Sequence, residues 1–512
     1  SSQVIKTAQA AWPDFKYKKR ARLRYDLHGL YMMGSVGSIA QSRASDFDYW
    51  LCHRPGLTTD QLIALEHKSL AITSWAEEVN LEVHFFLMNA AAFKDGEVLH
   101  LSEHSSGSAQ YHLLLDEFYR TSVLVAGRMP AWWYVPSEHE AQFDKYLEKI
   151  EQLKLASRAE MVDFGHIAEI PAEEFFGAAL WQLYKAIDSP FKSVLKILVM
   201  EAYASQYPHI QPLSLGFKQL VFESQASLDE LDPYLMLYRL VEEYLTEKGQ
   251  FSRLDLVRRC FYLKLNIPLS QPSRLKNWRR DLLATVVNEW GWSKATLQDL
   301  DNRKHWKIDR VLRETRFLVR ELIQSYQFLS EFAKDKSALI NAEDLNTLGR
   351  KLYAAFERKA GKIELINPGI APNLLEDELT ILETKLQGNR SAWSLYRGKV
   401  TPNDAPSWHP LKRTRTLIEL LSWGYLNTLL DSNTHLLVYA DNTNVQTREL
   451  YELLQSLQNA FPQRADYGKH SADFSVAAKP LEFAVFVNVG VEPLEKLRRQ
   501  GKQMTSNKTD AL

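Results

Sequence analysis

Two carboxylates separated by one residue, Asp46 and Asp48, are the side chains of this 512-residue sequence best placed to do chemistry. Residues 47–52 alternate like a half-buried strand, and side chains two apart on a strand share a face. Two carboxylates on one face repel each other, so the arrangement usually requires a cation. Magnesium is typically bound by one or two carboxylates together with substrate phosphates. The spacing therefore predicts a magnesium site for a phosphate-bearing substrate.

A Gly-Ser turn, Gly34 and Ser35, precedes the two aspartates. Its backbone N–H groups and hydroxyl, at an expected helix start, would form a seat for an anion. Ser38 and Arg43 belong to the same loop and are candidates to contact that anion. The sequence thus places a predicted phosphate seat beside the predicted metal carboxylates.

A third carboxylate, Glu82, lies in an apolar strand predicted at 81–88. A charged residue in such a strand needs a partner. If this strand pairs beside the strand of Asp46 and Asp48, Glu82 completes a two-metal cluster. Two metal ions could activate an attacking hydroxyl and stabilise a pyrophosphate leaving group.

Lysines further along the chain are candidates to meet a triphosphate. Ser189 and Pro190 have the residue types of an N-cap and a first helical position. Lys192 would then lie in the first turn of that helix, with Lys196 one turn on. A helix N-terminus with lysines suits pyrophosphate, and Lys185 precedes the break. A solvated helix face is the alternative for all three lysines.

Three regions of the chain must position these residues. Residues 1–150 combine strands and helices into an expected compact α/β domain that carries the candidate site. Residues 151–358 have helical periodicity almost throughout and form an expected helical domain. Residues 359–512 return to strands and form an expected C-terminal α/β domain. The predicted fold class is α+β, with a mixed-sheet domain, a large helical domain and a C-terminal α/β domain.

Particular elements follow from the same patterns. The predicted helices lie at 59–79, 111–126, 411–430 and 447–460. The predicted strands of the third region lie at 362–366, 379–384, 392–396, 435–439 and 482–489.

Composition excludes several classes of protein. With 62 basic and 63 acidic residues, the net charge of −1 gives no field to recruit nucleic acid or an anionic membrane. There is no apolar run near the length of a membrane span, no apolar signal segment and no P-loop motif. Two cysteines exclude a disulfide framework and fit a reducing compartment, so a cytoplasmic location is expected. The polar residues 502–508 carry no terminating structure, so more chain is expected to follow.

Other residues have a structural interpretation. Trp50 is expected to pack in the core. Asp116 and Arg120, four apart on a predicted helix, are interpreted as an ion pair. Internal ion pairs are also expected for Arg258 and Arg259 with the nearby Asp255. None of these residues is assigned to the site.

The sequence resembles a known family at the residues described above. A Gly-Ser turn, a spacer, Asp-x-Asp and a later acidic strand residue are the pattern of the polymerase-beta-type nucleotidyltransferase superfamily. Gly34-Ser35, ten residues, and then Asp46-x-Asp48-x-Trp50 resemble more narrowly the class I adenylate cyclases of enterobacteria and related proteobacteria. Stretches at 113–120, 180–190, 253–264 and 350–357 look like the same family. The resemblance spans nearly the whole chain. It implies that residues 1–150 are a nucleotidyltransferase-type catalytic domain, that residues 151–358 complete the ATP cleft and that residues 359–512 are regulatory.

The resemblance implies conversion of ATP to 3′,5′-cyclic AMP and pyrophosphate, by metal-assisted attack of the ribose 3′-hydroxyl on the α-phosphate. It implies that Asp46 and Asp48 ligate two magnesium ions, with manganese as the alternative metal, and that Gly34 and Ser35 hold phosphates. Glu82 stands where the superfamily more commonly has Asp, so its role as ligand or base stays open. Family members usually continue into a longer C-terminal regulatory part. A regulatory protein of the sugar phosphotransferase system is therefore a candidate partner, acting through the C-terminal region.

Two other functions would use the same residues. A nucleotidyltransferase that moves AMP to a separate acceptor needs the same turn and carboxylates, and only its requirement for an acceptor distinguishes it. A non-catalytic module that binds nucleotide is the other alternative. The intact set of Asp46, Asp48 and Glu82 argues against that module.

Overall fold

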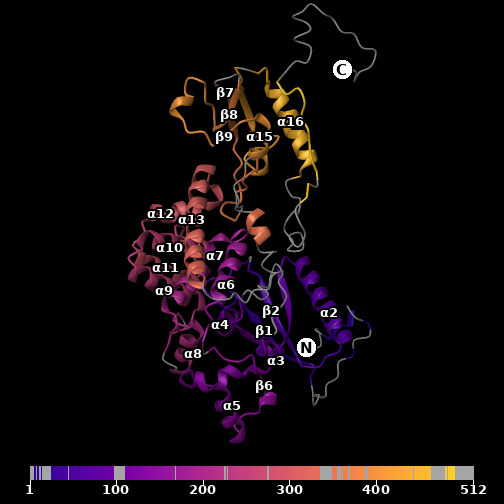
Figure 1. Cartoon of the computed structure of the whole chain (residues 1–512), viewed down its shortest axis with the longest axis vertical. Helices are drawn as coiled ribbons and strands as arrows, with labels where there is room; N and C mark the ends of the chain where they lie inside the picture. The colour runs from indigo at the N-terminus through magenta and orange to yellow at the C-terminus, as the bar shows by residue number, and fades with distance from the viewer. Residues whose placement is uncertain are drawn as a thin grey trace, which may run out of the picture. The chain divides into compact units, whose positions relative to one another are not determined.

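The computed structural model of this chain separates into two compact units. The first comprises Ser1–Val98, Tyr111–Ile170 and Gln211–Tyr234, and the second comprises Leu99–Gln110, Pro171–Ile210 and Leu235–Leu512. The structure describes residues 5–6, 9–10, 13, 16, 25–43, 45–96, 110–167, 169–223, 226–227, 229–273, 276–334, 349–354, 359, 361–366, 369–386, 390–441, 443–462, 479–480 and 482–490. Helices and sheets occur in both units, which confirms the predicted α+β class (Figure 1).

A four-stranded sheet with the order β3-β2-β1-β4 lies at the centre of the first unit. Its strands are β1 (Leu27–Met33), β2 (Phe47–His53), β3 (Val83–Asn89) and β4 (Val123–Gly127). Strand β1 pairs antiparallel with β2 and β4, whereas β2 and β3 are parallel and are joined by the crossover helix α2 (Thr59–Glu78). The predicted strands at 47–52 and 81–88 and the helix near 59–79 are thus confirmed.

Two local predictions in this unit are wrong. The helix expected over 111–126 ends early: α4 (His112–Thr121) is followed at once by β4. Val123 and Val125 satisfied a helical pattern in the sequence, but they extend the sheet edge beside β1. No helix begins at the Gly-Ser turn either, because residues 34–40, all of them described, form consecutive turns. Gly34 has a φ of +102°, outside the helical region.

One face of the sheet carries the core of the first unit. Trp50 on β2 is buried, and its ring stacks on Phe118 of α4 with centroids 4.2 Å apart. Tyr31 of β1 and Phe164 pack edge-on around the same pair. The predicted core role of Trp50 is confirmed.

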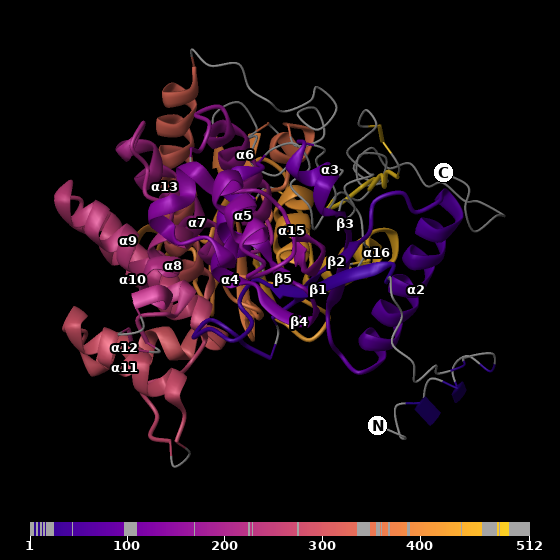
Figure 2. The same cartoon turned by 90° about the horizontal axis from the view of Figure 1, so that it is seen from below.

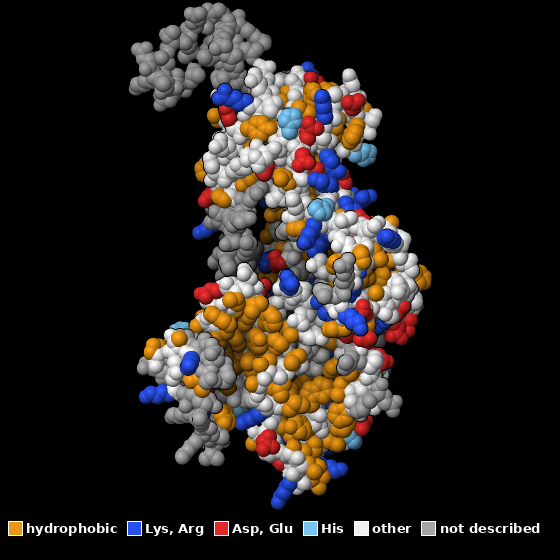
Figure 3. All heavy atoms as spheres, turned by 180° about the vertical axis from the view of Figure 1, so that it is seen from behind, with side chains coloured by type: hydrophobic (Ala, Val, Ile, Leu, Met, Phe, Trp, Pro, Cys, Tyr) orange, Lys and Arg blue, Asp and Glu red, His pale blue; other side chains and the backbone are white. Residues whose placement is uncertain are grey.

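The opposite face of the sheet and its edge are partly open. Leu27, Val123 and Val125 are exposed at the β1–β4 edge, and Trp75 of α2 is 61% exposed. Figure 3 shows hydrophobic side chains gathered over the strands beside α2. This apolar surface belongs to the first unit.

The remaining helices of the first unit come from distant parts of the chain. They are α3 (Ala90–Lys94), α5 (Phe143–Gln152), α8 (Leu213–Glu223) and the 3₁₀ turns η2 (Ala131–Tyr134), η3 (Ser137–Gln142) and η4 (Arg158–Glu160), beside the short strands β5 (Met129–Pro130) and β6 (Met161–Val162). Helix α8 falls within the region predicted as a helical domain, yet it packs here. Ser214 N–H donates to Asp116 Oδ1 at 2.9 Å, and Lys218 Nζ lies 2.9 Å from Glu140 Oε2.

The second unit begins with a helical part. Its helices are α6 (Glu174–Ala186), α7 (Pro190–Gln206), α9 (Pro233–Glu247), α10 (Phe251–Leu265), α11 (Trp278–Trp290), α12 (Lys294–Asp301), η5 (Asn302–His305) and α13 (Ile308–Ala333). Figures 1 and 2 both show α9 to α12 gathered on one side of this part. A buried network ties three of these helices: Arg253 of α10 bonds Glu201 of α7 and Glu321 of α13.

A second four-stranded sheet, with the order β10-β7-β8-β9, follows in the same unit. Its elements are β7 (Glu378–Leu386), β8 (Arg390–Arg397), η6 (Ala405–Ser407), β9 (Lys412–Thr414), α15 (Leu417–Leu426), β10 (His435–Tyr439) and α16 (Thr447–Ala460). The strands predicted at 379–384, 392–396 and 435–439 and the helix at 447–460 are confirmed.

Three predictions in this region are wrong. Residues 362–366 form no strand, because Ile366 N–H donates to the side chain of Asn427 instead of a neighbouring strand. Residues 482–489 form no strand either, and Phe483 among them is 87% exposed. The helix expected at 411–430 begins only after Thr416, whose side chain accepts from Glu419 N–H and caps it.

Among the helices described, none is both long and apolar enough to cross a membrane.

Candidate active site

The predicted carboxylates lie on or immediately before two adjacent parallel strands: Asp48 is in β2, and Asp46 and Glu82 directly precede β2 and β3. Asp48 of β2 is the register partner of His84 of β3, and Phe47 N–H donates to the carbonyl of Glu82 at 2.9 Å. The strand that follows Glu82 therefore pairs beside the aspartates, as the sequence analysis required. Register partners on parallel strands share a face, and so do residues two apart. Asp48 and His84 consequently share a face, and Asp46 and Glu82 lie close enough for their charges to act on His84.

His84 is a member of this group that the sequence analysis missed. Its Nε2 lies 3.1 Å from Glu82 Oε1. Burial alone would lower the pKa of His84, but the hydrogen bond to Glu82 and the charges of Asp48 and Asp46 outweigh burial and raise it. The sequence signal that could have identified His84 was its position two residues after Glu82, because residues two apart on a strand share a face. The carboxylates around His84 therefore favour its protonated, positively charged form.

Carboxylate oxygens grouped around the start of these two strands fit a hard divalent cation. The side chains do not converge on a single point, however: no group of three His, Cys, Asp or Glu side chains in the described part of the chain could hold a metal ion as arranged. The ligand set of Asp46, Asp48 and Glu82 therefore stays a prediction.

The Gly-Ser turn lies against the same face. Strand β1 ends at Met33, which is the antiparallel register partner of Asp48, so Gly34 is the next residue. A Cβ on Gly34 would lie 3.9 Å from Asp48 Oδ2. The pairing of β1 with β2 thus brings the predicted phosphate turn beside the predicted metal carboxylate.

The hydrogen bonds of the loop show which N–H groups are available. Gly34 N–H donates to Thr121 Oγ1, and Gly37 N–H to Gln41 Oε1. Acceptors are also present for the backbone N–H groups of the next five residues, Ser38, Ile39, Ala40, Gln41 and Ser42. Within the described residues of the loop, the backbone N–H groups of Ser35, Val36 and Arg43 have none. Ser35 is only 4% exposed, and the role of its N–H in binding phosphate stays a prediction.

The side chains of the loop divide into two kinds. Ser35 Oγ donates to Ser45 Oγ at 3.0 Å, and Ser38 Oγ donates to the carbonyl of Ser35 at 2.7 Å. Ser38 is buried, so in this structure its hydroxyl shapes the loop. Arg43 is exposed and has no hydrogen-bond or ion-pair partner among the residues described. Arg43 is thus an exposed cation in this loop, and its contact with an anion stays a prediction.

The three predicted lysines belong to the second unit. Helix α7 begins at Pro190 with Ser189 at the N-cap position, as predicted, although the Ser189 side chain makes no capping hydrogen bond. Lys192 and Lys196 are half-buried on α7. Lys185 of α6 lies with Nζ 5.5 Å from the centroid of the Trp181 ring. Their contact with a nucleotide remains a prediction.

Arg303 is a further cation near the start of α7 that sequence reasoning missed. Its Cζ lies 5.7 Å from the ring centroid of Phe191, the second residue of α7. Burial lowers the pKa of Arg303, and no carboxylate or hydrogen-bond acceptor accompanies it among the described residues. No local sequence signal connects residue 303 to residue 191.

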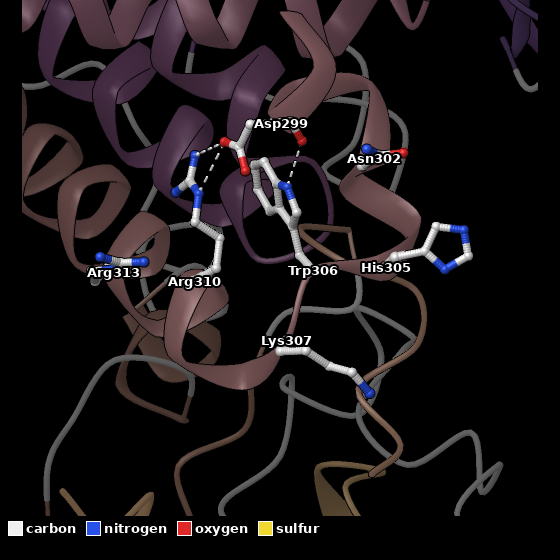
Figure 4. A pocket seen from close by; sticks show the side chains of 7 residues that line it. All are labelled: Asp299, Asn302, His305, Trp306, Lys307, Arg310 and Arg313. Carbon is white, nitrogen blue, oxygen red and sulfur yellow. Dashed lines mark hydrogen bonds and ion pairs between the residues drawn. The ribbon is translucent and has the colours of Figure 1, made fainter. Parts of the chain in front are cut away.

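A surface hollow of about 580 Å³ in the second unit is not a candidate phosphate site. Arg310 there pairs with Asp299 and Glu314, and Lys307 pairs with Glu376, so the central cations already have carboxylate partners. The hollow is lined by Asp299, Asn302, His305, Trp306, Lys307, Arg310 and Arg313 (Figure 4).

Other charged residues hold the helices together. Arg259 pairs with Asp255 and with Glu314, and Arg258 pairs with Glu242 at 3.0 Å, so their structural interpretation is confirmed.

The predicted Asp116–Arg120 pair is replaced by tertiary contacts. Asp116 accepts from Ser214, and Arg120 Nη1 donates to the carbonyl of Pro233 at 2.7 Å. Residues distant in sequence thus take the place of the partner four residues away.

Comparison with known proteins identifies the family. Three family models match this chain: the adenylate cyclase NT domain at residues 1–133, the class-I adenylate cyclase second domain at 170–367 and the class-I third domain at 374–465. The chain belongs to the class I adenylate cyclase family. The Gly-Ser turn and its carboxylates fall in the NT domain of that family.

Curated relatives carry the same name. The adenylate cyclases of Escherichia coli K12 and Shigella flexneri are each 39% identical over 485 residues, which are 94% of this chain and 57% of the relative. That of Proteus mirabilis is 38% identical over 494 residues, 94% of this chain and 56% of the relative. The chain therefore spans little more than half the length of these class I cyclases. No solved structure matches it.

Proposed function

We propose that this chain is an adenylate cyclase that converts ATP into 3′,5′-cyclic AMP and pyrophosphate. The observation that carries the proposal is the placement of the Gly34 turn against Asp48, with Asp46 and Glu82 directly before the two paired strands. Membership of the class I family supports it, since the relatives are named adenylate cyclases. The relatives are longer than this chain, so its own activity requires a direct test.

The donor set fits a divalent cation with hard oxygen ligands. Asp46, Asp48 and Glu82 would hold it, as one magnesium ion or two, with manganese as the alternative. Bound there, it would increase the acidity of the 3′-hydroxyl and stabilise the charge on the leaving group.

The residues of the loop bind the phosphates in this proposal. The N–H groups of Ser35 and Val36 donate to phosphate oxygens, and Arg43 neutralises their charge. Glu82 is accessible from solvent, since its side chain is 62% exposed. It either ligates the cation or accepts the proton of the 3′-hydroxyl, and the metal titration described in the Discussion separates these roles.

Lysines at the α6–α7 break are candidates to neutralise the pyrophosphate in this proposal, as the sequence analysis expected. Lys192 and Lys196 lie on the first turns of α7, Arg303 packs on the same end, and Lys185 precedes it. A helix N-terminus adds a partial positive charge to these side chains. The departing group carries most of the negative charge, so this is where cations lower the barrier.

The proposal extends to location and regulation. Cys52 and Cys260 are both buried as free thiols, which supports a reducing, cytoplasmic setting. We also propose that a regulatory protein of the sugar phosphotransferase system acts through the C-terminal region, a partner that only the family resemblance supports.

Incubation of the purified chain with magnesium and ATP, followed by chromatography of the products, tests the activity. We expect cyclic AMP and pyrophosphate in equal amounts, and their loss in Asp48→Asn. Asp60→Asn, an exposed carboxylate in the first turn of α2, is the matched control and should leave the rate unchanged. AMP appearing on an added acceptor, with no cyclic AMP, would instead indicate a nucleotidyltransferase. Cyclic AMP formed at the normal rate by Asp48→Asn would contradict the assignment of the site.

A further inference from the structure

The phosphate-side loop is held from a part of the chain far outside the N-terminal region. Ile39 N–H donates to Oδ2 of Asp232 at 2.6 Å, across 193 residues of sequence. Asp232 is 4% exposed and Ile39 is fully buried, so water is not a substitute partner for either group. Both residues belong to the first unit.

The second oxygen of the same carboxylate has a different partner. Asp232 Oδ1 accepts from Tyr234 N–H at 2.9 Å. Helix α9 begins at Pro233, so Asp232 occupies the N-cap position and this bond caps the helix. One carboxylate therefore caps α9 with one oxygen and holds the loop with the other.

The segment that carries Asp232 is itself fixed to α4, the helix that also contacts the loop. Arg120 Nη1 donates to the carbonyl of Pro233 at 2.7 Å. The next residue of α4, Thr121, accepts from Gly34 N–H at 3.3 Å. The loop is thus anchored at its first residue by Thr121 and at its sixth by Asp232, and the N–H groups of Ser35 and Val36 lie between the two anchors.

We propose that Asp232 is a positioning residue for the phosphate-binding loop of the cyclase site. It touches Ile39 and sets the backbone path that aims the N–H groups of Ser35 and Val36, without touching substrate. Misplacing such donors by a fraction of an ångström weakens charge-assisted hydrogen bonds to phosphate. The inference rests on the proposed function, because it assigns these N–H groups to ATP phosphates.

Substitution can separate the two roles of Asp232. Asp232→Ser retains a side-chain oxygen that caps α9, since serine is a favoured N-cap, but the shorter side chain does not reach Ile39. Asp232→Asn retains the length of the side chain but has only one acceptor oxygen, whereas the N–H groups of Ile39 and Tyr234 each bind a different oxygen of Asp232. Thr58→Ala removes the side-chain cap of α2 in the same unit and leaves the loop untouched, which makes it the matched control.

The experiment measures KM for ATP, kcat, the affinity for magnesium ATP and the thermal midpoint for each variant. We expect Asp232→Ser to raise KM and to weaken magnesium ATP binding at least tenfold. Its thermal midpoint should fall further than that of Thr58→Ala, because the N–H of Ile39 is left buried without an acceptor. The KM of Thr58→Ala should stay within twofold of the wild type. Asp232→Asn should lie between Asp232→Ser and the wild type.

Three results would overturn the inference. They are an unchanged KM and ATP affinity in Asp232→Ser, an equal change in Thr58→Ala, and a wild type that binds no magnesium ATP. A wild type that binds magnesium ATP and forms no cyclic AMP contradicts the proposed function alone. In that case the comparison of affinities still decides the role of Asp232.

Discussion

Glu82 Oε1 and His84 Nε2 lie 3.1 Å apart on the face of the sheet that also carries Asp48. The pair follows from strand geometry, because residues two apart on a strand share a face. The pairing of β3 with β2 then places both beside the Asp46–Asp48 segment. Glu82 has the more exposed side chain of the pair, so it is the one most open to a cation or a substrate.

We expect Glu82→Gln to raise the magnesium concentration needed for half-maximal activity about tenfold, because the amide keeps the size of the side chain and loses its charge. Titration of activity with magnesium at saturating ATP measures this. Glu78→Gln, an exposed change at the end of α2, is the control. A lower kcat with an unchanged magnesium requirement would show that Glu82 acts as a base and not as a ligand.

Gly34→Ala should weaken ATP binding and destabilise the chain by about 1–3 kcal/mol, since a φ of +102° strains any residue with a Cβ. The new methyl would also lie against Asp48. Gly56→Ala introduces similar strain at another positive φ, away from the loop. Urea unfolding should show comparable losses in the two variants. If KM for ATP rises equally in both, Gly34 has no particular role in the loop.

Lys192→Ala should raise KM for ATP about tenfold through the loss of one charge-assisted hydrogen bond to phosphate. The effect on kcat should be smaller than on KM if the contact is already made in the ground state. Lys294→Ala, an exposed lysine at the start of α12, provides the comparison. An unaltered dependence on ATP concentration would remove Lys192 from the site.

Stability should depend on pH through the buried Arg253 network. Burial alone would raise the pKa of Glu201, but its hydrogen bonds to Arg253 outweigh burial and hold it below the ordinary value of 4.5. A depressed carboxyl pKa stabilises the folded state above that ordinary value, and the contribution is lost as pH falls through the folded pKa.

Glu201→Gln should therefore cost about 3 kcal/mol near neutral pH, because Arg253 is left buried with one carboxylate fewer. Urea unfolding at a series of pH values should show this difference shrinking below pH 4.5. Glu243→Gln, exposed on α9, should leave the pH profile of stability unchanged. A constant difference between wild type and Glu201→Gln down to about pH 3 would contradict the assignment of the pKa.

The local parts of the site were predictable from sequence. Alternation around Asp48, the apolar strand after Glu82 and the turn at Gly34 are short-range patterns, and strand pairing converts them into neighbours. The tie between Ile39 and Asp232 was not predictable, since no periodicity encodes which distant carboxylate meets a given N–H. The same limit explains Arg303 beside Phe191.

The wrong elements have related causes. Residues 123–126 are apolar enough to continue a helix, and only the vacant edge of β1 made them a strand. Residues 362–366 have strand composition, but their N–H partner is the side chain of Asn427. In both segments the tertiary partner decided the structure and local propensity did not.

Residues 211–234 belong to the first unit, although residues 171–210 before them belong to the second. This order of segments affects how the chain folds during synthesis. Until those residues leave the ribosome, Asp116, Glu140 and Ile39 lack Ser214, Lys218 and Asp232 as partners. Buried polar groups without partners are costly, so the sheet can assemble early but its loop stays loosely held. The nascent chain therefore acquires an ordered loop at residues 34–40 only after residue 234 has emerged, well beyond β4, the last strand of that sheet.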